Sequence, residues 1–285
     1  MPTVTERFVA DFHDSLPGGS SLAFGALAVD DVHGQRHASP YHALLDRLQA
    51  AEAELLPGPL LDLACGDGHL LALLASAAAG GRTHLGVDFS AGELTSARTR
   101  LGGELPLYQA RAQALPLADA SVAVITCHMA LMLMAEPEAV VGELRRVLRP
   151  GGRLLAVVPA AAMPEAPPDP LTAAFGAALT GHARHAEWQA VRFETRRWRD
   201  PASLRALLQA AFLPPRFTRL TGTQALTPDA AWAWFSGLYD LHLSPPAAWP
   251  AIAADFRRRL PPLLDDRGLA ALPHSFFLID ATAAS

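Results

Sequence analysis

Residues 60–71 read LLDLACGDGHLL, and this stretch decides which fold the sequence predicts. The apolar run at 60–63 is typical of a buried strand, and the apolar residues after Gly68 are typical of a helix. Small residues at Ala64, Gly66 and Gly68 let the backbone turn tightly and approach a ligand closely. Because the first amides of a helix have no partner within it, this strand–turn–helix unit predicts a site for an adenosine-type cofactor.

The residues in this turn also indicate which cofactor it holds. A dinucleotide fingerprint has the form G-x-G-x-x-G, but its third glycine is replaced by Leu71. Asp62 can engage a cationic amino group, which S-adenosylmethionine carries and NAD lacks. We therefore expect S-adenosylmethionine at a site formed by Asp62, Ala64, Cys65, Gly66 and Gly68. For the loop taken alone, an ordinary strand-to-helix turn is the alternative.

A second acid supports this expectation. Asp88 ends the predicted strand at 84–87 and follows Gly68 by 20 residues, the place from which an acid accepts hydrogen bonds from ribose hydroxyls. Phe89 follows and can cover one face of the adenine. A solvated acid at the end of a strand is the alternative for Asp88. Ser90 begins a helix to residue 101, and Glu93 three positions later predicts a capping box.

Strands and helices alternate along the first part of the chain. Strands are predicted at 60–63, 84–87, 105–109, 122–126 and 153–158. Helices are predicted at 41–56, 68–79, 90–101 and 137–148. Such alternation, with buried strands, predicts an α/β fold with a doubly wound, mostly parallel, Rossmann-like sheet.

The pattern changes after residue 159. An Ala/Pro-rich connector at 160–170 precedes a predicted helix at 200–211, a strand at 216–220, a helical insertion at 228–264 and a strand at 275–281. We expect four parts, which are a lid segment at 1–40, a cofactor-binding core at 41–160, an insertion or lid at 161–199, and a C-terminal part at 200–285 with a helical insertion at about 226–270. The last part completes a seven-stranded sheet whose last strand is antiparallel.

Four ordered motifs resemble those of the class I S-adenosylmethionine-dependent methyltransferases, especially the bacterial small-molecule type. They are DLACGDG at 62–68, GVDFSAGELTSAR at 86–98, ARAQALPLADASVAVI at 110–125 and ELRRVLRPGGRLLAVVP at 143–159. The resemblance is strong over residues 41–160 and weak in the C-terminal third. It implies an enzyme that transfers a methyl group from S-adenosylmethionine to an O or N atom of a small molecule.

Two positions depart from that family. Arg111 stands where the family often has an aspartate that meets the adenine amino group, and Ala123 stands where an aspartate often begins the next strand. Ala112 and Gln113 would then have to frame the adenine through their backbone groups or the Gln113 amide. A S-adenosylmethionine-binding protein without methyl transfer therefore stays open as an alternative, with Arg111 as its best support.

By the same resemblance, the segment TCHMALMLM at 126–134 lines the methyl-transfer site. His128 is placed where a general base could reach a hydroxyl or amine, and histidine has a pKa suited to that task. A buried histidine or a simple pocket wall is the alternative, because proximity and orientation alone can drive methyl transfer. Cys127 is expected at the cofactor.

Aromatic and methionine side chains supply the candidates for a substrate pocket. The candidates are Tyr41, Met129, Met132, Trp232 and Tyr239. Packing within the lid itself is the more common role of aromatic residues such as the last two, and core packing explains the two methionines equally well.

Composition restricts the function further. The chain has 285 residues and a net charge of −5, which disfavours a nucleic-acid substrate, with a local basic patch left open as the alternative. Cys65 and Cys127 form no CxxC motif, so we expect no metal. The longest uncharged apolar stretch, at 122–135, is shorter than the ~20 residues that span a bilayer. With no secretory signal in its first residues, the sequence predicts a cytoplasmic protein that acts on a small molecule. The sequence leaves the oligomeric state open.

A nicotinamide-dependent oxidoreductase on a similar fold is a weaker alternative. Such an enzyme needs the third loop glycine and a catalytic Tyr/Lys pair or its equivalent. The chain has Leu71 at the glycine position and contains no lysine.

Overall fold

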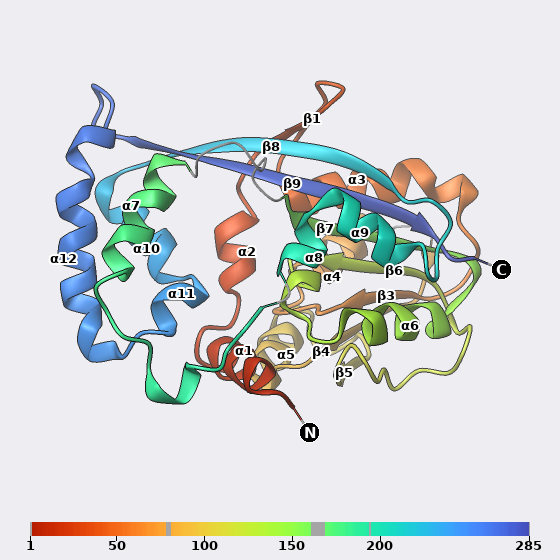
Figure 1. Ribbon diagram of the computed structural model, residues 1–285. Coiled ribbons are helices and arrows are strands. Elements are labelled where there is room, and N and C mark those ends of the chain that lie inside the picture. The colour runs from red at the N-terminus through yellow and green to blue at the C-terminus, as the bar shows by residue number, and fades with distance from the viewer. Residues whose placement is uncertain (1, 78–80, 161–168, 194, 285) are drawn as a thin grey trace.

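The computed structural model describes residues 2–77, 81–160, 169–193 and 195–284, and within these ranges nine strands form one mixed sheet (Figure 1). The strands are β1 (Val29–Asp31), β2 (Arg36–His37), β3 (Leu60–Leu63), β4 (His84–Asp88), β5 (Leu107–Gln109), β6 (Val122–His128), β7 (Leu148–Pro159), β8 (Arg216–Leu226) and β9 (Ala270–Thr282). Their order across the sheet is β2-β1-β8-β9-β7-β6-β3-β4-β5. The expectation of seven strands was therefore wrong. The hairpin of β1 and β2 adds two strands at the edge, where β1 pairs with β8.

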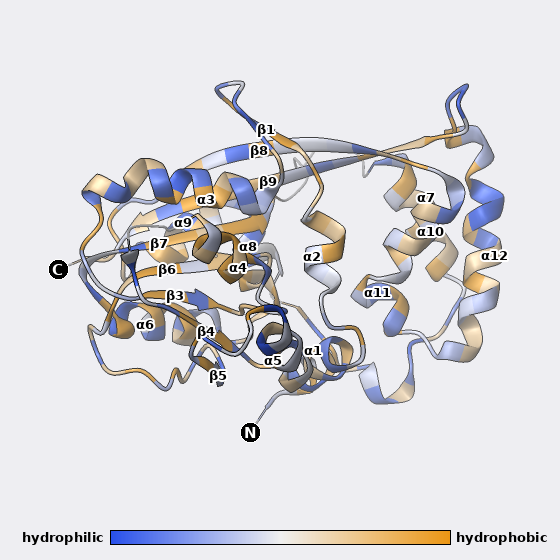
Figure 2. Cartoon of the chain, turned by 180° about the vertical axis from the view of Figure 1, so that it is seen from behind, coloured by the Kyte–Doolittle hydropathy of each residue, from blue (hydrophilic) through white to orange (hydrophobic). Residues whose placement is uncertain are grey.

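The centre of the sheet is parallel, as the sequence predicts. β3 pairs in parallel with both β4 and β6, β4 pairs with β5, and β6 pairs with β7. Every residue of β3 and β6 is buried, because helices cover both faces of a parallel sheet. Figure 2 shows β3, β6 and β7 as largely hydrophobic strands between α3 and α6, on the side of the molecule away from α12. The predicted antiparallel last strand, β9, pairs with β7 and β8.

Helices occupy the predicted places in the core and continue into the C-terminal third. They are α1 (Val4–Ser15), α2 (Gly19–Phe24), α3 (Pro40–Ala51), α4 (His69–Ser76), α5 (Ala91–Arg100), α6 (Pro137–Val147), α7 (Pro170–Leu179), α8 (Thr195–Arg199), α9 (Pro201–Leu208), α10 (Pro228–Ser236), α11 (Tyr239–His242) and α12 (Trp249–Arg259). Residues 78 and 79 of the helix predicted at 68–79, and residues 161–168 of the connector predicted at 160–170, lie outside the described residues. In the part of the chain that is described, no helix is long and apolar enough to cross a membrane.

One predicted helix cap is only half correct. The Ser90 hydroxyl accepts a hydrogen bond from the backbone N–H of Glu93, so Ser90 does cap α5. The Glu93 carboxylate does not return to the backbone of Ser90, and the predicted capping box was therefore wrong. That carboxylate instead contacts His13 and Gly18 of the N-terminal segment. Packing of α1 against α5 brings these residues to it.

The antiparallel strands β8 and β9 are longer than the strands predicted at 216–220 and 275–281. Their register runs from Arg216 opposite Asp280 to Leu226 opposite Ala270, and their outer half extends beyond the parallel core. At the end far from the C-terminus they carry a cap of α7, α10, α11 and α12 (Figure 1). The cap helices form their own apolar core, to which the ends of β8 and β9 contribute. The strands extend because these helices pack on them, so the residues of the strands alone did not predict the extension.

The N-terminal segment lies between the cap and the parallel core in both views of the chain. Helix α1 contacts α5, and the chain breaks at Gly18, whose φ of 79° lies in the left-handed region. This break turns α2 toward the space between the core and the cap. The N-terminal helices are thereby placed next to the ends of β3 and β4.

Candidate cofactor-binding site

The glycine loop between β3 and α4 has the conformation that its small residues allow. Ala64, Gly66 and Gly68 have φ values of 55°, 53° and 77°, which glycine adopts freely and alanine adopts at a cost. A Cβ at Gly66 would meet nothing closer than the Glu93 Oε2 atom at 3.8 Å, so Gly66 is open toward a ligand. A Cβ at Gly68 would lie 3.2 Å from that of Ala97, so Gly68 is small because α5 packs on it.

A pocket of about 1030 Å³, counted to its open mouth, lies at the carboxyl ends of β3 and β4. The strand order changes direction at β3, and ligands bind at this switch point in open α/β sheets. The predicted residues that line the pocket are Tyr41, Asp62, Ala64, Cys65, Gly66, Asp88, Phe89, Ala112, Gln113, His128 and Met129.

Five predicted site residues lie outside this lining, and each has another position in the fold. They are Gly68, which packs on α5, Cys127 and Met132, which are buried in the main apolar core, Trp232, which packs on Phe256 in the cap, and Tyr239, which contacts His13. Cys127 faces away from the pocket although its neighbour His128 lines it, because successive side chains of a strand alternate between the two faces. Trp232 therefore packs within the cap, which was the alternative to a place in the substrate pocket.

Asp62 is a buried carboxyl group on β3 that lines the pocket. The hydroxyl of Thr126 on the neighbouring strand β6 donates a hydrogen bond to its Oδ1 atom over 2.8 Å. Burial raises the pKa of Asp62 to about 7, although this hydrogen bond opposes the rise. A cationic partner in the pocket would relieve the cost of burying the charged form.

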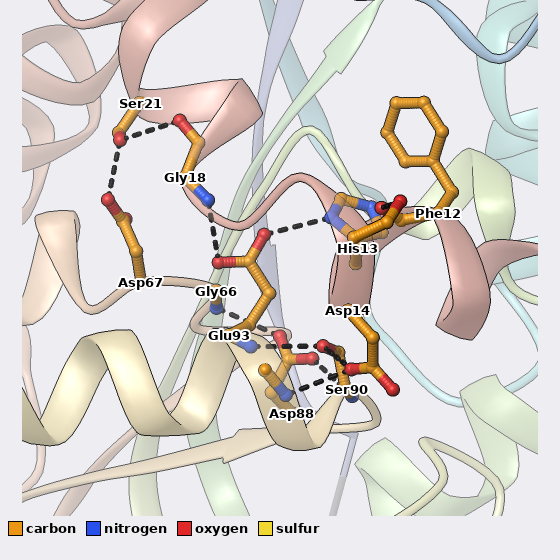
Figure 3. A network of polar contacts seen from close by, with 12 residues as sticks. Phe12, His13, Asp14, Gly18, Ser21, Gly66, Asp67, Asp88, Ser90 and Glu93 are labelled. Carbon is orange, nitrogen blue, oxygen red and sulfur yellow. Dashed lines mark hydrogen bonds and ion pairs between the residues drawn. The ribbon is translucent and has the colours of Figure 1, made fainter.

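Asp88 joins the two loops that form the pocket floor. Its Oδ2 atom accepts a hydrogen bond from the Gly66 N–H, and its Oδ1 atom accepts one from the Ser90 N–H, both over 2.8 Å (Figure 3). Burial raises the pKa of Asp88, and these two backbone bonds oppose the rise. Each carboxylate oxygen has a second lone pair, so Asp88 can hold the glycine loop and still accept ligand hydroxyls.

The sequence reasoning missed the polar contacts by which the N-terminal segment closes the pocket. The Glu93 carboxylate accepts a hydrogen bond from the Gly18 N–H and contacts the His13 ring, each over 2.9 Å (Figure 3). The hydroxyl of Ser21 donates to Asp67 in the glycine loop over 2.6 Å. The signal that could have revealed this closure is the helical spacing of Glu6, Val9 and His13, which lie on one face of α1 and line the pocket.

The charge of the lining suits a cationic ligand. Five carboxyl groups line the pocket, namely Glu6, Asp62, Asp67, Asp88 and Glu93. Among the described lining residues Arg111 is the single arginine, and it is paired with Glu6. S-adenosylmethionine carries a sulfonium and an ammonium group against one carboxylate, so this set of acids fits it.

His128, the last residue of β6, also lines the pocket. Its ring stacks on Tyr41 with centroids 3.5 Å apart and an interplanar angle of 19°. Neither ring nitrogen has a hydrogen-bond partner among the described residues. Burial, with a smaller contribution from nearby His69, lowers the pKa of His128 well below its usual 6.5, so the imidazole is neutral.

Comparison with known proteins agrees with this geometry. Residues 61–156 match a family described as a methyltransferase domain. A demethylmenaquinone methyltransferase of Thermus thermophilus is 34% identical over 154 residues, which cover 48% of this chain and 66% of that protein. A malonyl-[acyl-carrier protein] O-methyltransferase of Methylococcus capsulatus is 39% identical over 139 residues, which cover 47% of this chain and 48% of that protein. The chain thus spans about half to two thirds of the length of these relatives.

A solved structure extends the fold comparison. The phosphoethanolamine N-methyltransferase 2 of Haemonchus contortus, in complex with S-adenosylhomocysteine, aligns with a TM-score of 0.57 at 12% identity. The alignment covers 100% of this chain and 61% of that one, and at this identity it shows the fold.

The loop, the strand-end acid and the parallel sheet define a domain that binds an adenosyl cofactor. Residues 61–156 form a methyltransferase domain, the fold is that of the class I S-adenosylmethionine-dependent methyltransferases, and S-adenosylmethionine is the cofactor.

Proposed function

We propose that this chain transfers a methyl group from S-adenosylmethionine to an O or N atom of a neutral small molecule. The observation that carries the proposal is the pocket itself, which is lined by several acids and by a neutral, unpaired His128 at the end of β6. The cofactor supplies an electrophilic methyl group on its sulfonium. The protein binds and orients both reactants and excludes water.

The roles of the cofactor residues follow from their positions. Asp62 would hold the ammonium of the methionine part, and Asp88 would accept hydrogen bonds from the ribose hydroxyls. Gly66 leaves room for the ligand beside the loop, and Phe89 would cover the adenine. Ala112 and Gln113 would frame the adenine. The side-chain amide of Gln113 already donates a hydrogen bond to the Ala135 carbonyl over 2.6 Å, so we propose that the backbone groups of these two residues meet the base.

His128 is the candidate for contact with the methyl acceptor. A neutral imidazole with an unpaired nitrogen can accept a hydrogen bond from a hydroxyl or amine and thereby aim the lone pair of that atom. Because the lowered pKa makes His128 a weak base, we propose that orientation is its larger contribution and proton acceptance its smaller one.

The charge of the lining also limits the acceptor. Within the described lining, the guanidinium of Arg111 is engaged by Glu6 and Glu136, which leaves no free cation to bind a carboxylate acceptor. Met129 and Met134 line the same pocket and provide an apolar surface. We therefore propose a neutral acceptor such as an alcohol, a phenol or an uncharged amine.

Calorimetry followed by product analysis tests the proposal. We expect micromolar binding of S-adenosylmethionine and S-adenosylhomocysteine and no binding of NADH. With a panel of neutral alcohols, phenols and amines, we expect formation of S-adenosylhomocysteine together with a methylated product, and none with matched carboxylic acids. Binding of NADH in preference to the adenosyl ligands would contradict the cofactor, and methylation of the acids alone would contradict the substrate class.

A further inference from the structure

Helix α1 places a buried carboxylate in the wall of the cofactor pocket. Glu6 lines the pocket, and only 8% of its surface is exposed. Its Oε1 atom accepts hydrogen bonds from the Nε and Nη2 atoms of Arg111 over 2.9 and 2.6 Å. Its Oε2 atom accepts one from the backbone N–H of Thr3 over 2.7 Å, as part of a capping box. Oε2 therefore has a lone pair left for a further donor.

The position of Arg111 shows which part of a cofactor this wall meets. Residues 110–113 follow β5, which pairs with β4, the strand that ends at Asp88. The Gln109 side chain donates to the Phe89 carbonyl over 3.1 Å, so this wall lies beside the residue expected at the adenine. A ribose held at Asp88 would thus direct its base toward the pair of Glu6 and Arg111.

We propose that Glu6 recognises the exocyclic amine of the adenine, and that Arg111 is the positioning residue that holds the Glu6 carboxylate in place. This inference rests on the proposed binding of S-adenosylmethionine. The adenine edge offers an amine that donates and ring nitrogens that accept, and the pair offers a carboxylate that accepts and a guanidinium that donates. A site with a buried carboxylate rejects an analogue that lacks the donor, because its polar group is then left unpaired.

The proposal has a consequence for the N-terminal segment. Glu6 belongs to α1, whereas the other expected cofactor residues belong to the sheet and its loops. A hydrogen bond from the base to Glu6 forms only when α1 is docked, so the cofactor and α1 stabilise each other's bound position.

The test measures the preference for adenine by calorimetry, without turnover. The two ligands are S-adenosylhomocysteine and its analogue with hydrogen in place of the 6-amino group. A hydrogen bond to a charged group contributes about 1.5–3 kcal/mol, so the unmodified protein should prefer the amine by roughly 10- to 100-fold. We expect Glu6→Ala to bind both ligands with similar affinity, and Glu6→Gln to keep an intermediate preference, because a neutral amide accepts a weaker bond.

Two control variants separate recognition from folding. Glu136→Ala removes the exposed partner of Arg111, 3.3 Å away, and should leave the preference unchanged. Thr5→Ala removes the hydrogen bonds that tie α1 to the backbone of Arg192, and should lower the preference less than Glu6→Ala does, because the Glu6 carboxylate is kept.

Three outcomes would overturn the inference. A full preference in Glu6→Ala would show that another group reads the amine. An equal loss of preference in Thr5→Ala would show that docking of α1, rather than the Glu6 carboxylate, is responsible. If the unmodified protein bound neither ligand, the proposed function would fall as well, which distinguishes that failure from the first two.

Discussion

His13 and Glu93 are 80 residues apart in the chain, yet the His13 Nδ1 atom lies 2.9 Å from the Glu93 Oε1 atom beside the cofactor pocket. The other ring nitrogen of His13 contacts the hydroxyl of Tyr239 on α11 over 2.7 Å. A buried carboxylate of the core is thereby joined through one histidine to the cap. The contact explains how a helix at the N-terminus can close a pocket that the parallel sheet forms.

Breaking this contact should loosen α1. We expect Glu93→Ala to remove the hydrogen bond from Gly18 and the contact with His13, and to weaken S-adenosylmethionine binding by about 1–3 kcal/mol. Hydrogen exchange of residues 4–15 should become faster. Asp229→Ala, which removes an exposed ion pair of the cap, is the control and should change neither quantity. Unaltered exchange in Glu93→Ala would show that α1 is held by its apolar contacts.

Asp88 provides the most direct test of the cofactor site. Asp88→Ala should weaken S-adenosylmethionine binding by roughly 1–3 kcal/mol, since charge-assisted hydrogen bonds to the ribose and the Gly66 contact are lost. Asp88→Asn keeps the shape of the side chain and should lose less. Calorimetry measures both, and an affinity equal to that of the unmodified protein would remove Asp88 from the ribose site.

His128 should affect turnover more than cofactor affinity. We expect His128→Ala to lower kcat while the Kd for S-adenosylmethionine stays nearly constant. Because the pKa of His128 lies well below 6.5, its neutral form persists above that range, and its contribution should be lost only as the pH falls through the lowered pKa. The measurement is the pH dependence of kcat for both proteins. A loss confined to high pH would contradict the assignment.

Asp62 should make cofactor binding depend on pH. The ammonium group of the cofactor favours the carboxylate form, and burial raises the pKa of Asp62 to about 7. Affinity should therefore rise as the pH increases through about 7, with release of a proton on binding. Calorimetry in buffers of different ionisation enthalpy detects that proton. Asp62→Asn should bind more weakly and release none.

Asp62 should also make the stability of the fold depend on pH, but stability should fall as the pH rises, whereas cofactor affinity should increase. The folded pKa of about 7 lies above the usual value of 3.8, so the folded state binds the Asp62 proton more tightly than the unfolded chain. The contribution of Asp62 to the free energy of unfolding is fully present below about pH 4 and is lost as the pH rises through about 7. The loss is about 1.4 kcal/mol for each pKa unit. Denaturant unfolding should show a larger decline in the unmodified protein than in Asp62→Asn, which keeps only the smaller decline from Asp88 and other buried acids.

Local pattern predicted the parts of the fold whose cause is local. The burial of β3 and β6 produces continuous apolar runs, and the cap at Ser90 begins a helix where the sequence places it. The outer half of β8 and β9 was missed because the cap helices that pack on it lie elsewhere in the chain. The short strands β1 and β2 were missed because pairing with β8, rather than their own composition, makes them strands.

By itself, the sequence determined the parallel core, the glycine loop and the two acids Asp62 and Asp88, because strand burial, tight turns and helix starts depend on neighbouring residues. The tertiary structure alone decided that Glu93 contacts His13 instead of capping its own helix, and that Glu6 lies beside Arg111 in the pocket wall. These contacts join residues that are 80 and 105 positions apart. A buried carboxylate takes whichever donor the packing brings to it, and no local pattern encodes that choice.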